Sequence, residues 1–272
     1  MKHRQTRRFA KVVAMASFAL IATAPPVADA GPDARTIMDK VAQTRKLDGS
    51  EAVLEMTIID KHGNERKLQL AMASKLFDDG KTEKRIYRFL SPPDVKGTGV
   101  LVFDYEIEDD STWVYLPALR RVRRIVSAKR SKSFMGSEFS YADLNIPSLD
   151  DYTYALLREE SEQGEDCWVI EVLPKDEDTA KADGYSKKTY WVAKADHTVR
   201  KGLLYDLDGE LLKEFLSRDI ELLDPDKRRY RSTHMEMTNK QNGRKSVFES
   251  SKVVFSPDVK SELFTTRELE RM

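Results

Sequence analysis

The chain has 272 residues, of which 40% are hydrophobic and 34% charged. This balance is typical of a globular protein and excludes a multi-span membrane protein. Lys and Arg together number 46, as do Asp and Glu, so the chain lacks the basic excess of a nucleic-acid-binding protein.

The first thirty residues have the pattern of a secretory signal peptide. The apolar stretch at 12–24 is too short to span a bilayer, and Pro25 and Pro26 end it. Ala28-Asp29-Ala30 is a typical cleavage site, which predicts a signal peptide at 1–30 and one mature domain at 31–272. An N-terminal membrane anchor is the alternative. The basic residues before the apolar stretch are Lys2, Arg4, Arg7, Arg8 and Lys11.

The N-terminal half of the mature chain has the alternation of β-strands after one helix, which is predicted at 32–47. Segments 52–59 and 67–72 alternate apolar and polar residues on either side of His62-Gly63-Asn64. This pattern predicts a hairpin with one apolar face. Further strands are predicted at 85–90, 101–105 and 113–116.

The C-terminal half is also rich in strands, with a short helix predicted through Leu156 and Leu157 behind a capping aspartate. Strands are predicted at 167–173, 188–193, 199–206, 211–219, 229–238 and 246–255, with a polar loop at 176–184 and a closing helix at 261–271. Tight turns and the lack of helices between strands favour antiparallel pairing. We therefore expect a mainly β (α+β) fold, either one wide curved sheet or an incomplete barrel.

The only cysteine, Cys167, lies in the apolar run 167–170. An exported domain with one cysteine forms no internal disulfide, so its hydrophobic core has to hold the fold alone. We predict a buried and inert thiol at this position.

The segment 113–144 concentrates positive charge beside apolar and aromatic residues. It has no Asp or Glu between Ser111 and Ser137. An apolar surface with a cationic rim suits an amphiphile with an anionic headgroup, although a solvated basic face on an ordinary hairpin explains the pattern equally well. The basic residues predicted to bind a headgroup or partner are Arg120, Arg121, Arg123, Arg124, Lys129 and Arg130.

Several strand residues are predicted to line a hydrophobic cavity on the inner face of the sheet. Met56, Met72, Met235 and Met237 occupy strand positions, and their flexible side chains suit a lining that accepts irregular chains, although ordinary core methionines are the alternative. The predicted lining comprises Leu54, Met56, Leu70, Met72, Trp113, Tyr115, Leu116, Phe134, Met135, Phe139, Met235 and Met237.

Searches of the sequence for catalytic motifs give no candidate. His3, His62, His197 and His234 are scattered, so neither a histidine-rich metal site nor a histidine-based triad is indicated. The chain contains no G-x-S-x-G and no S-x-x-K. We therefore predict a protein that is not an enzyme and that uses neither metal nor cofactor.

Three motifs carry a resemblance to a known family. They are FLSPPDVKGTGVLVFD at 89–104, WVYLPALRRVRRI at 113–125 and SFMGSEFSYADL at 133–144. Together they resemble the outer membrane lipoprotein-sorting protein-like family, which is related to the LolA and LolB periplasmic carriers. They are most similar to the branch associated with RND-type (MMPL) exporters.

The resemblance implies a half-open antiparallel β-barrel of about 11–12 strands, with a few helices over its concave hydrophobic face. It implies a periplasmic carrier or chaperone for lipids or lipoprotein acyl chains, which works in outer-membrane-directed transport. The implied partners are an RND-type inner-membrane transporter and, transiently, a membrane. A periplasmic sensor of mislocalised lipoproteins is the alternative function, and an exported hydrolase is a third.

Overall fold

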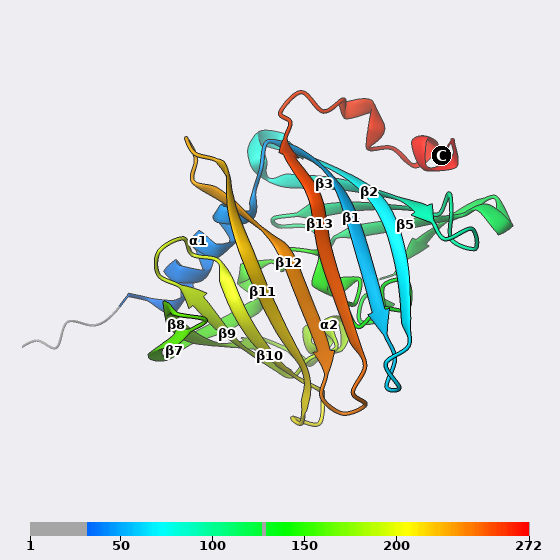
Figure 1. Cartoon of the computed structure of the whole chain (residues 1–272). Coiled ribbons are helices and arrows are strands. Elements are labelled where there is room, and N and C mark those ends of the chain that lie inside the picture. The colour runs from blue at the N-terminus through cyan, green and yellow to red at the C-terminus, as the bar shows by residue number, and fades with distance from the viewer. Residues whose placement is uncertain (1–31, 127–128, 272) are drawn as a thin grey trace, which may run out of the picture. The chain divides into compact units, whose positions relative to one another are not determined.

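The computed structural model describes residues 32–126 and 129–271. The signal peptide predicted at 1–30 therefore lies outside the described residues. From Pro32 onward the chain forms one compact unit built on a single sheet (Figure 1). No helix of the described residues is long and apolar enough to cross a membrane.

The described strands join in one 13-stranded antiparallel sheet, which confirms the mainly β fold. β1 to β6 follow one another across one half of the sheet, and β7 to β13 across the other. β13 pairs with β1, so these two strands meet in the middle of the sheet. β6 and β7 form its two edges and do not pair with each other, so the barrel is open between them. The strands are β1 (Gly49–Ile59), β2 (Glu65–Phe77), β3 (Thr82–Ser91), β4 (Gly99–Tyr105), β5 (Ser111–Leu116), β6 (Arg121–Ile125), β7 (Tyr152–Glu162), β8 (Glu165–Pro174), β9 (Lys187–Ala193), β10 (Val199–Tyr205), β11 (Leu211–Asp224), β12 (Arg229–Asn239) and β13 (Lys245–Phe255).

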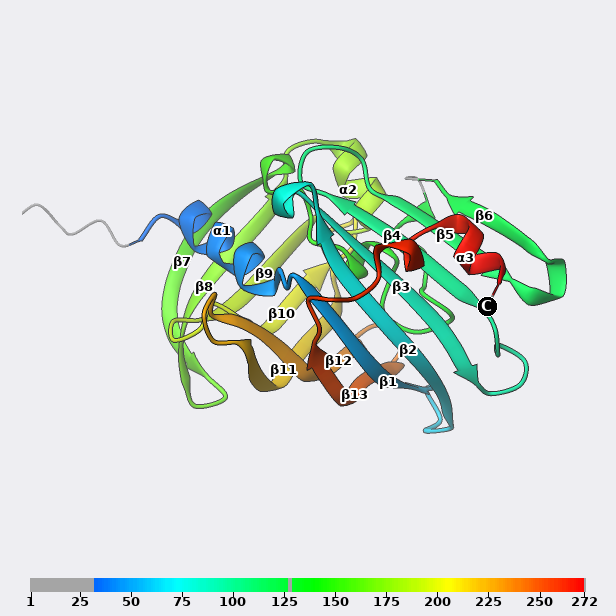
Figure 2. The same cartoon turned by 90° about the horizontal axis from the view of Figure 1, so that it is seen from above.

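The sheet is curved, so it has a concave and a convex face (Figure 2). Helix α1 (Ala34–Arg45) crosses the concave face over β7, β8 and β9. The carboxylate of Asp33 caps the helix by accepting a hydrogen bond from the Thr36 N–H at 3.0 Å. Helical spacing then puts one apolar side of α1 on the sheet. The helix residues in this cluster are Ala34, Ile37, Met38 and Val41, and they pack on Tyr152, Ile170, Val172 and Val192.

The C-terminal segment covers part of the convex face (Figures 1 and 2). It contains a single-turn helix, η6 (Ser261–Leu263), and a short helix, α3 (Thr266–Glu270). Phe264 is buried here, with its ring 5.7 Å from that of Phe77. This convex cluster joins Val259, Phe264 and Leu269 to Ala73, Ile86, Leu101 and Tyr115.

Four local predictions were wrong or incomplete. The helix predicted through Leu156 and Leu157 is instead strand β7, preceded by the single turn η5 (Leu149–Asp151). The alternating Tyr152, Tyr154 and Leu156 all pack in the α1 cluster, which requires a strand period of two. The predicted polar loop at 176–184 contains α2 (Glu177–Asp183), β6 was not predicted, and the closing helix is shorter than expected.

We expect Phe264→Ala to lower the free energy of unfolding by about 3 kcal/mol, because it leaves a cavity in the convex cluster. Urea denaturation of the mature protein measures this change. A loss below about 1 kcal/mol would show that the C-terminal segment contributes little to the stability of the sheet.

Candidate functional site

A continuous apolar cluster lies on the concave face of the sheet, and we call it the concave cluster. Strand register assembles it, because Met56 lies opposite Leu68 on β2 and opposite Phe248 on β13. Both Met56 and Leu68 are fully buried. The predicted lining residues in this cluster are Leu54, Met56, Leu70, Met72, Leu116, Phe134, Met135, Phe139, Met235 and Met237.

Trp113 and Tyr115, the other two predicted lining residues, lie on the opposite face. They pack in the convex cluster beside the C-terminal segment. Their neighbours on β5, Val114 and Leu116, belong to the concave cluster. Alternation along a strand therefore separates the pairs, so Trp113 and Tyr115 do not line the same surface as Leu116.

Residues 130–145, which connect β6 to β7 along the chain and which we call the plug segment, pack on the concave face of the sheet. Phe134 is fully buried, with its ring 6.1 Å from Tyr87, 6.0 Å from Phe89 and 6.4 Å from Phe248. Phe139 lies 4.9 Å from the same Phe248 ring. Aromatic rings of the plug segment therefore cover the concave cluster.

Glu138 fastens the middle of the plug segment to β12 and β13. Its N–H donates to Ser246 Oγ at 2.9 Å, and its Oε2 accepts from Asn239 Nδ2 at 3.0 Å. Arg244 Nε lies 3.1 Å from Glu138 Oε1, and Lys213 Nζ donates to the Glu138 carbonyl at 2.6 Å. This buried carboxylate therefore has a partner for each oxygen, as burial of a charge requires.

Asn145 fastens the end of the plug segment to a buried charged network. Arg85 Nη2 donates to Asn145 Oδ1 at 3.0 Å and to Asp104 Oδ2 at 2.7 Å. Asn145 Nδ2 donates to Asp110 Oδ2 at 2.6 Å, and the Ile146 N–H donates to Asp104 Oδ2 at 2.8 Å. The guanidinium of Arg85 thus links the sheet to the plug segment.

Burial decides the electrostatics of this network. It raises the pKa of Asp104 to about 6, although the neighbouring Arg85 opposes the rise. Burial likewise raises the pKa of Asp110. Arg130, which was predicted to bind a headgroup or partner, instead lies 3.2 Å from Asp110 and is mostly buried. Its placement gives it a role in holding the plug segment.

Asp143 provides a further contact on the other side of the plug segment. The Tyr185 hydroxyl donates to its two carboxylate oxygens at 3.2 and 3.1 Å. Burial raises the pKa of Tyr185 well above its usual value, so the hydroxyl stays protonated and keeps donating. Lys213 Nζ lies 3.2 Å from the same hydroxyl oxygen.

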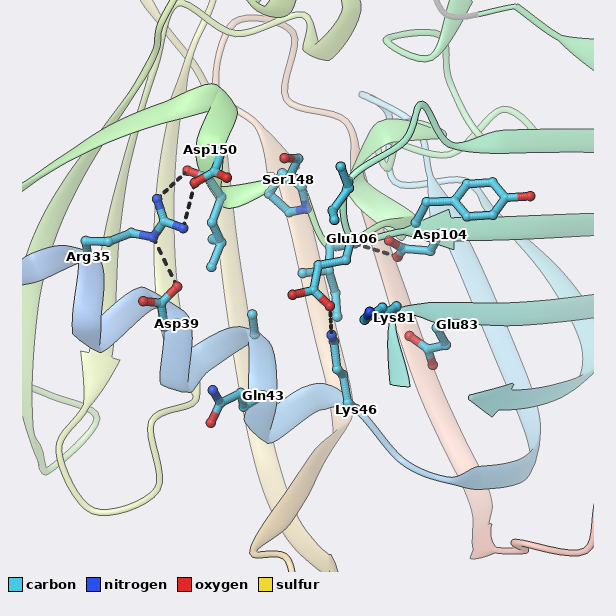
Figure 3. Close-up of a pocket in the computed structure, with 16 residues that line it drawn as sticks. Arg35, Asp39, Gln43, Lys46, Lys81, Glu83, Asp104, Glu106, Ser148 and Asp150 are labelled. Carbon is cyan, nitrogen blue, oxygen red and sulfur yellow. Dashed lines mark hydrogen bonds and ion pairs between the residues drawn. The ribbon is translucent and has the colours of Figure 1, made fainter. Parts of the chain in front are cut away.

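A polar pocket of about 270 Å³ lies between α1, the adjoining ends of β3 and β4, and residues 146–150 (Figure 3). Arg35 on its rim pairs with Asp39 at 3.0 Å and with Asp150 at 2.9 Å. Lys46 pairs with Glu106 at 3.2 Å. Asp104, which belongs to the buried charged network around Arg85, forms part of the wall of this pocket. The pocket therefore adjoins the end of the plug segment.

The remaining predicted basic residues lie at one margin of the sheet. Arg120 is in the turn before β6, with a left-handed φ of 45°, and is exposed. Arg121 and Arg123 are exposed on β6 itself, and Lys129 is exposed beyond its end. Arg124 differs, because it donates to Ser111 Oγ at 2.8 Å and its guanidinium lies 5.9 Å from the centre of the Trp113 ring.

Sequence reasoning missed the charged network and the polar pocket. One signal was present, since Arg85 alternates with Tyr87 and Phe89 and so had to share their apolar face. A buried arginine on such a face requires carboxylate partners. The identity of these partners came only from the fold, because Asp104, Asp110 and Asn145 lie on other segments.

The chain is similar to a family model and to several solved structures. A family model described as "Uncharacterized protein" matches residues 81–271. A crystal structure of an outer membrane lipoprotein-sorting protein domain from Vibrio parahaemolyticus is 31% identical with a TM-score of 0.80. The match covers 88% of this chain and 98% of that domain. The chain belongs to the outer membrane lipoprotein-sorting protein-like family.

Two other crystal structures are similar to this chain. A DUF1329 family protein from Desulfovibrio piger is 29% identical with a TM-score of 0.79, over 87% of this chain and 97% of that one. A LolA superfamily protein from Nitrosomonas europaea shares the fold at 21% identity and a TM-score of 0.65, over 86% and 98% of the two chains. A search of curated proteins gave no match.

We expect Arg85→Met to lower the free energy of unfolding by about 3–5 kcal/mol at pH 7.5, because it leaves the buried carboxylate of Asp104 without its counter-charge. Asp104 has a folded-state pKa raised above its unfolded value, so its protonation favours the folded state. The associated stability is present at low pH and is lost as pH rises through about 6. Without Arg85 the folded-state pKa of Asp104 rises further, so Asp104 is protonated at pH 5 and the destabilisation by the substitution should be smaller there than at pH 7.5.

Urea denaturation of both proteins at pH 7.5 and pH 5 measures the effect. An equal loss at both pH values would contradict the assignment of Arg85 as the counter-charge of Asp104.

Proposed function

We propose that the protein is a periplasmic carrier that binds the acyl chains of a lipid or lipoprotein on its concave cluster. The observation that carries the proposal is a continuous apolar face covered by a loop. The plug segment lends no strand to the sheet, and its backbone-to-backbone hydrogen bonds run within 129–145, as from Phe134 N–H to Phe139 O at 2.7 Å. Only side chains of the sheet and its turns, such as Ser246 and Lys213, bond to its main chain from outside. The cover can therefore move away while the sheet keeps its ladder of hydrogen bonds.

The energetics of exchange favour an acyl ligand. Each methylene that enters an apolar site gains about 0.8 kcal/mol, so roughly ten methylenes supply about 8 kcal/mol. This gain is of the same order as the lost burial of Phe134 and Phe139, at roughly 1.5–3 kcal/mol each, together with the broken polar contacts of Glu138 and Asn145. The methionines of the concave cluster adapt to chains of different shape because their side chains are flexible.

Export and delivery complete the proposed function. The basic start, the apolar stretch and Ala28-Asp29-Ala30 support export by a cleaved signal peptide, which leaves one carrier domain in the periplasm. The motifs at 89–144 support an RND-type inner-membrane transporter as partner, with transient membrane contact. The similarity to a lipoprotein-sorting protein domain supports transport toward the outer membrane. No catalytic step belongs to this function.

The protein purified from periplasm should carry an acylated molecule. Native mass spectrometry should show a mass above that of the polypeptide, and solvent extraction should separate a lipid from an acylated peptide. The apo protein should also bind cis-parinaric acid with a rise in fluorescence. An apo protein that neither carries nor takes up an acyl chain would overturn the carrier function.

A looser plug segment should bind the same probe more tightly. We expect Glu138→Gln to raise the affinity for cis-parinaric acid about tenfold, because the ion pair with Arg244 is lost and the open state is more populated. A fluorescence titration measures the dissociation constant.

Asp196→Asn is the matched control for this experiment. It also breaks an ion pair of a buried carboxylate, that of Asp196 with Arg200 at 2.6 Å, and this pair lies outside the plug segment. Its affinity for the probe should equal that of the native protein. Equal affinities for all three proteins would contradict displacement of the plug segment by the ligand.

A further inference from the structure

The exposed arginines of β6 are not used by the acyl-binding surface, and they lie on a free edge of the sheet. β6 is hydrogen-bonded to β5 and ends the sheet on that side (Figure 2). Among residues 32–126 and 129–271, no strand pairs with its other edge. The outward N–H and C=O groups of β6 are therefore open to another strand.

The opposite edge of the sheet is different, because the acidic residues of β7 are neutralised within the protein. Glu159 lies 2.6 Å from Lys194, and Glu162 lies 3.3 Å from Lys201. Arg120, Arg121 and Arg123 take part in no ion pair with any described residue. The charges of β6 are thus available to an external partner.

Strand register places two of these arginines on one face at a regular spacing. Arg121 lies opposite Leu116 and Arg123 lies opposite Val114, and both partners belong to the concave cluster. Residues two apart along a strand are separated by roughly 6.6 Å. Carboxylates at alternate positions of an added strand have the same separation, so they match the two guanidinium groups.

We propose that β6 binds an extended acidic segment of a protein partner by strand addition, with carboxylates at alternate positions opposite Arg121 and Arg123. Such a segment satisfies both the free main-chain groups and the charges. Exposed Lys129 and Lys132 extend the positive field, which no acid interrupts between Ser111 and Ser137.

Lipid headgroups fit this edge less well than a protein strand does. A phosphate pairs with a guanidinium but leaves the main-chain groups of β6 without partners. The arginine on the other face of the strand, Arg124, is already engaged with Ser111 and Trp113. Within β6 the free charge therefore lies on one face of the strand, which suits the side chains of a neighbouring strand.

This partner site goes beyond the proposed carrier function and does not depend on the identity of the cargo. The concave cluster binds apolar chains by burial, whereas the edge of β6 binds by main-chain hydrogen bonds and charge. The two surfaces can therefore be tested separately on one protein.

The test uses a fluorescein-labelled ten-residue peptide of alternating Glu and Thr, followed by fluorescence anisotropy with the mature protein. Two comparison peptides have the same composition, one with its glutamates in a block and one methylated at every second main-chain nitrogen. We expect both to bind about tenfold more weakly than the alternating peptide. Hydrogen exchange should show added protection of the β6 amides that do not bond to β5, and only with the alternating peptide.

The variant R121E/R123E should bind the alternating peptide at least about tenfold more weakly than the native protein. The control R88E/R218E makes the same charge change at exposed arginines of β3 and β11 and should bind normally. Circular dichroism checks folding, and R121Q/R123Q replaces the first variant if that variant does not fold.

Equal binding of all three peptides would overturn strand addition in favour of simple charge attraction. Binding to phosphatidylglycerol vesicles that requires Arg121 and Arg123, without peptide binding, would replace the protein partner with a lipid surface. Uptake of cis-parinaric acid is measured on the same proteins. A failed peptide test with normal uptake therefore rejects the edge site alone, and failed uptake rejects the carrier function.

Discussion

The structure depends on one constraint, which is that an open, curved sheet exposes an apolar concave face that has to be covered. Helix α1 covers this face over β7 to β9, and the plug segment covers it over the middle strands. The two covers differ in kind. The helix satisfies its own main chain, so it packs through apolar side chains, whereas the irregular plug segment is also held to the sheet by the polar contacts of Glu138 and Asn145.

Much of the fold was predictable from the sequence because alternation reports both the strand and the face. The hairpin of β1 and β2 put Leu54, Met56, Leu70 and Met72 on one surface, and the structure gathers them in the concave cluster. The same rule applied to β5 would have separated Trp113 from Leu116. Strand β7 was missed because the adjacent leucines within it also suit a helix, and only packing against α1 distinguishes the two.

The fastening of the plug segment was not predictable in the same way. Alternation shows that Arg85 faces the apolar side of β3, but not which of the 46 acidic residues meets it. Asp104 comes from the next strand and Asn145 from a loop 60 residues away. Side-chain pairs of this kind depend on how the loop returns over the sheet, and local sequence patterns carry no signal for that path.

The pairing of β1 with β13 determines when, during synthesis, the middle of the sheet can form. Glu51 lies opposite Val254, so roughly 200 residues have to emerge before the middle of the sheet can close. Until then one edge of β1 has unpaired main-chain groups beside an apolar face, which is the combination that promotes aggregation. Long-range closure of this kind is slow, because the entropy of the connecting chain is lost before the pairing contacts form. The N-terminal half of the sheet therefore depends on β13, which is synthesised much later, and a chaperone that shields β1 during this interval would raise the yield of folded protein.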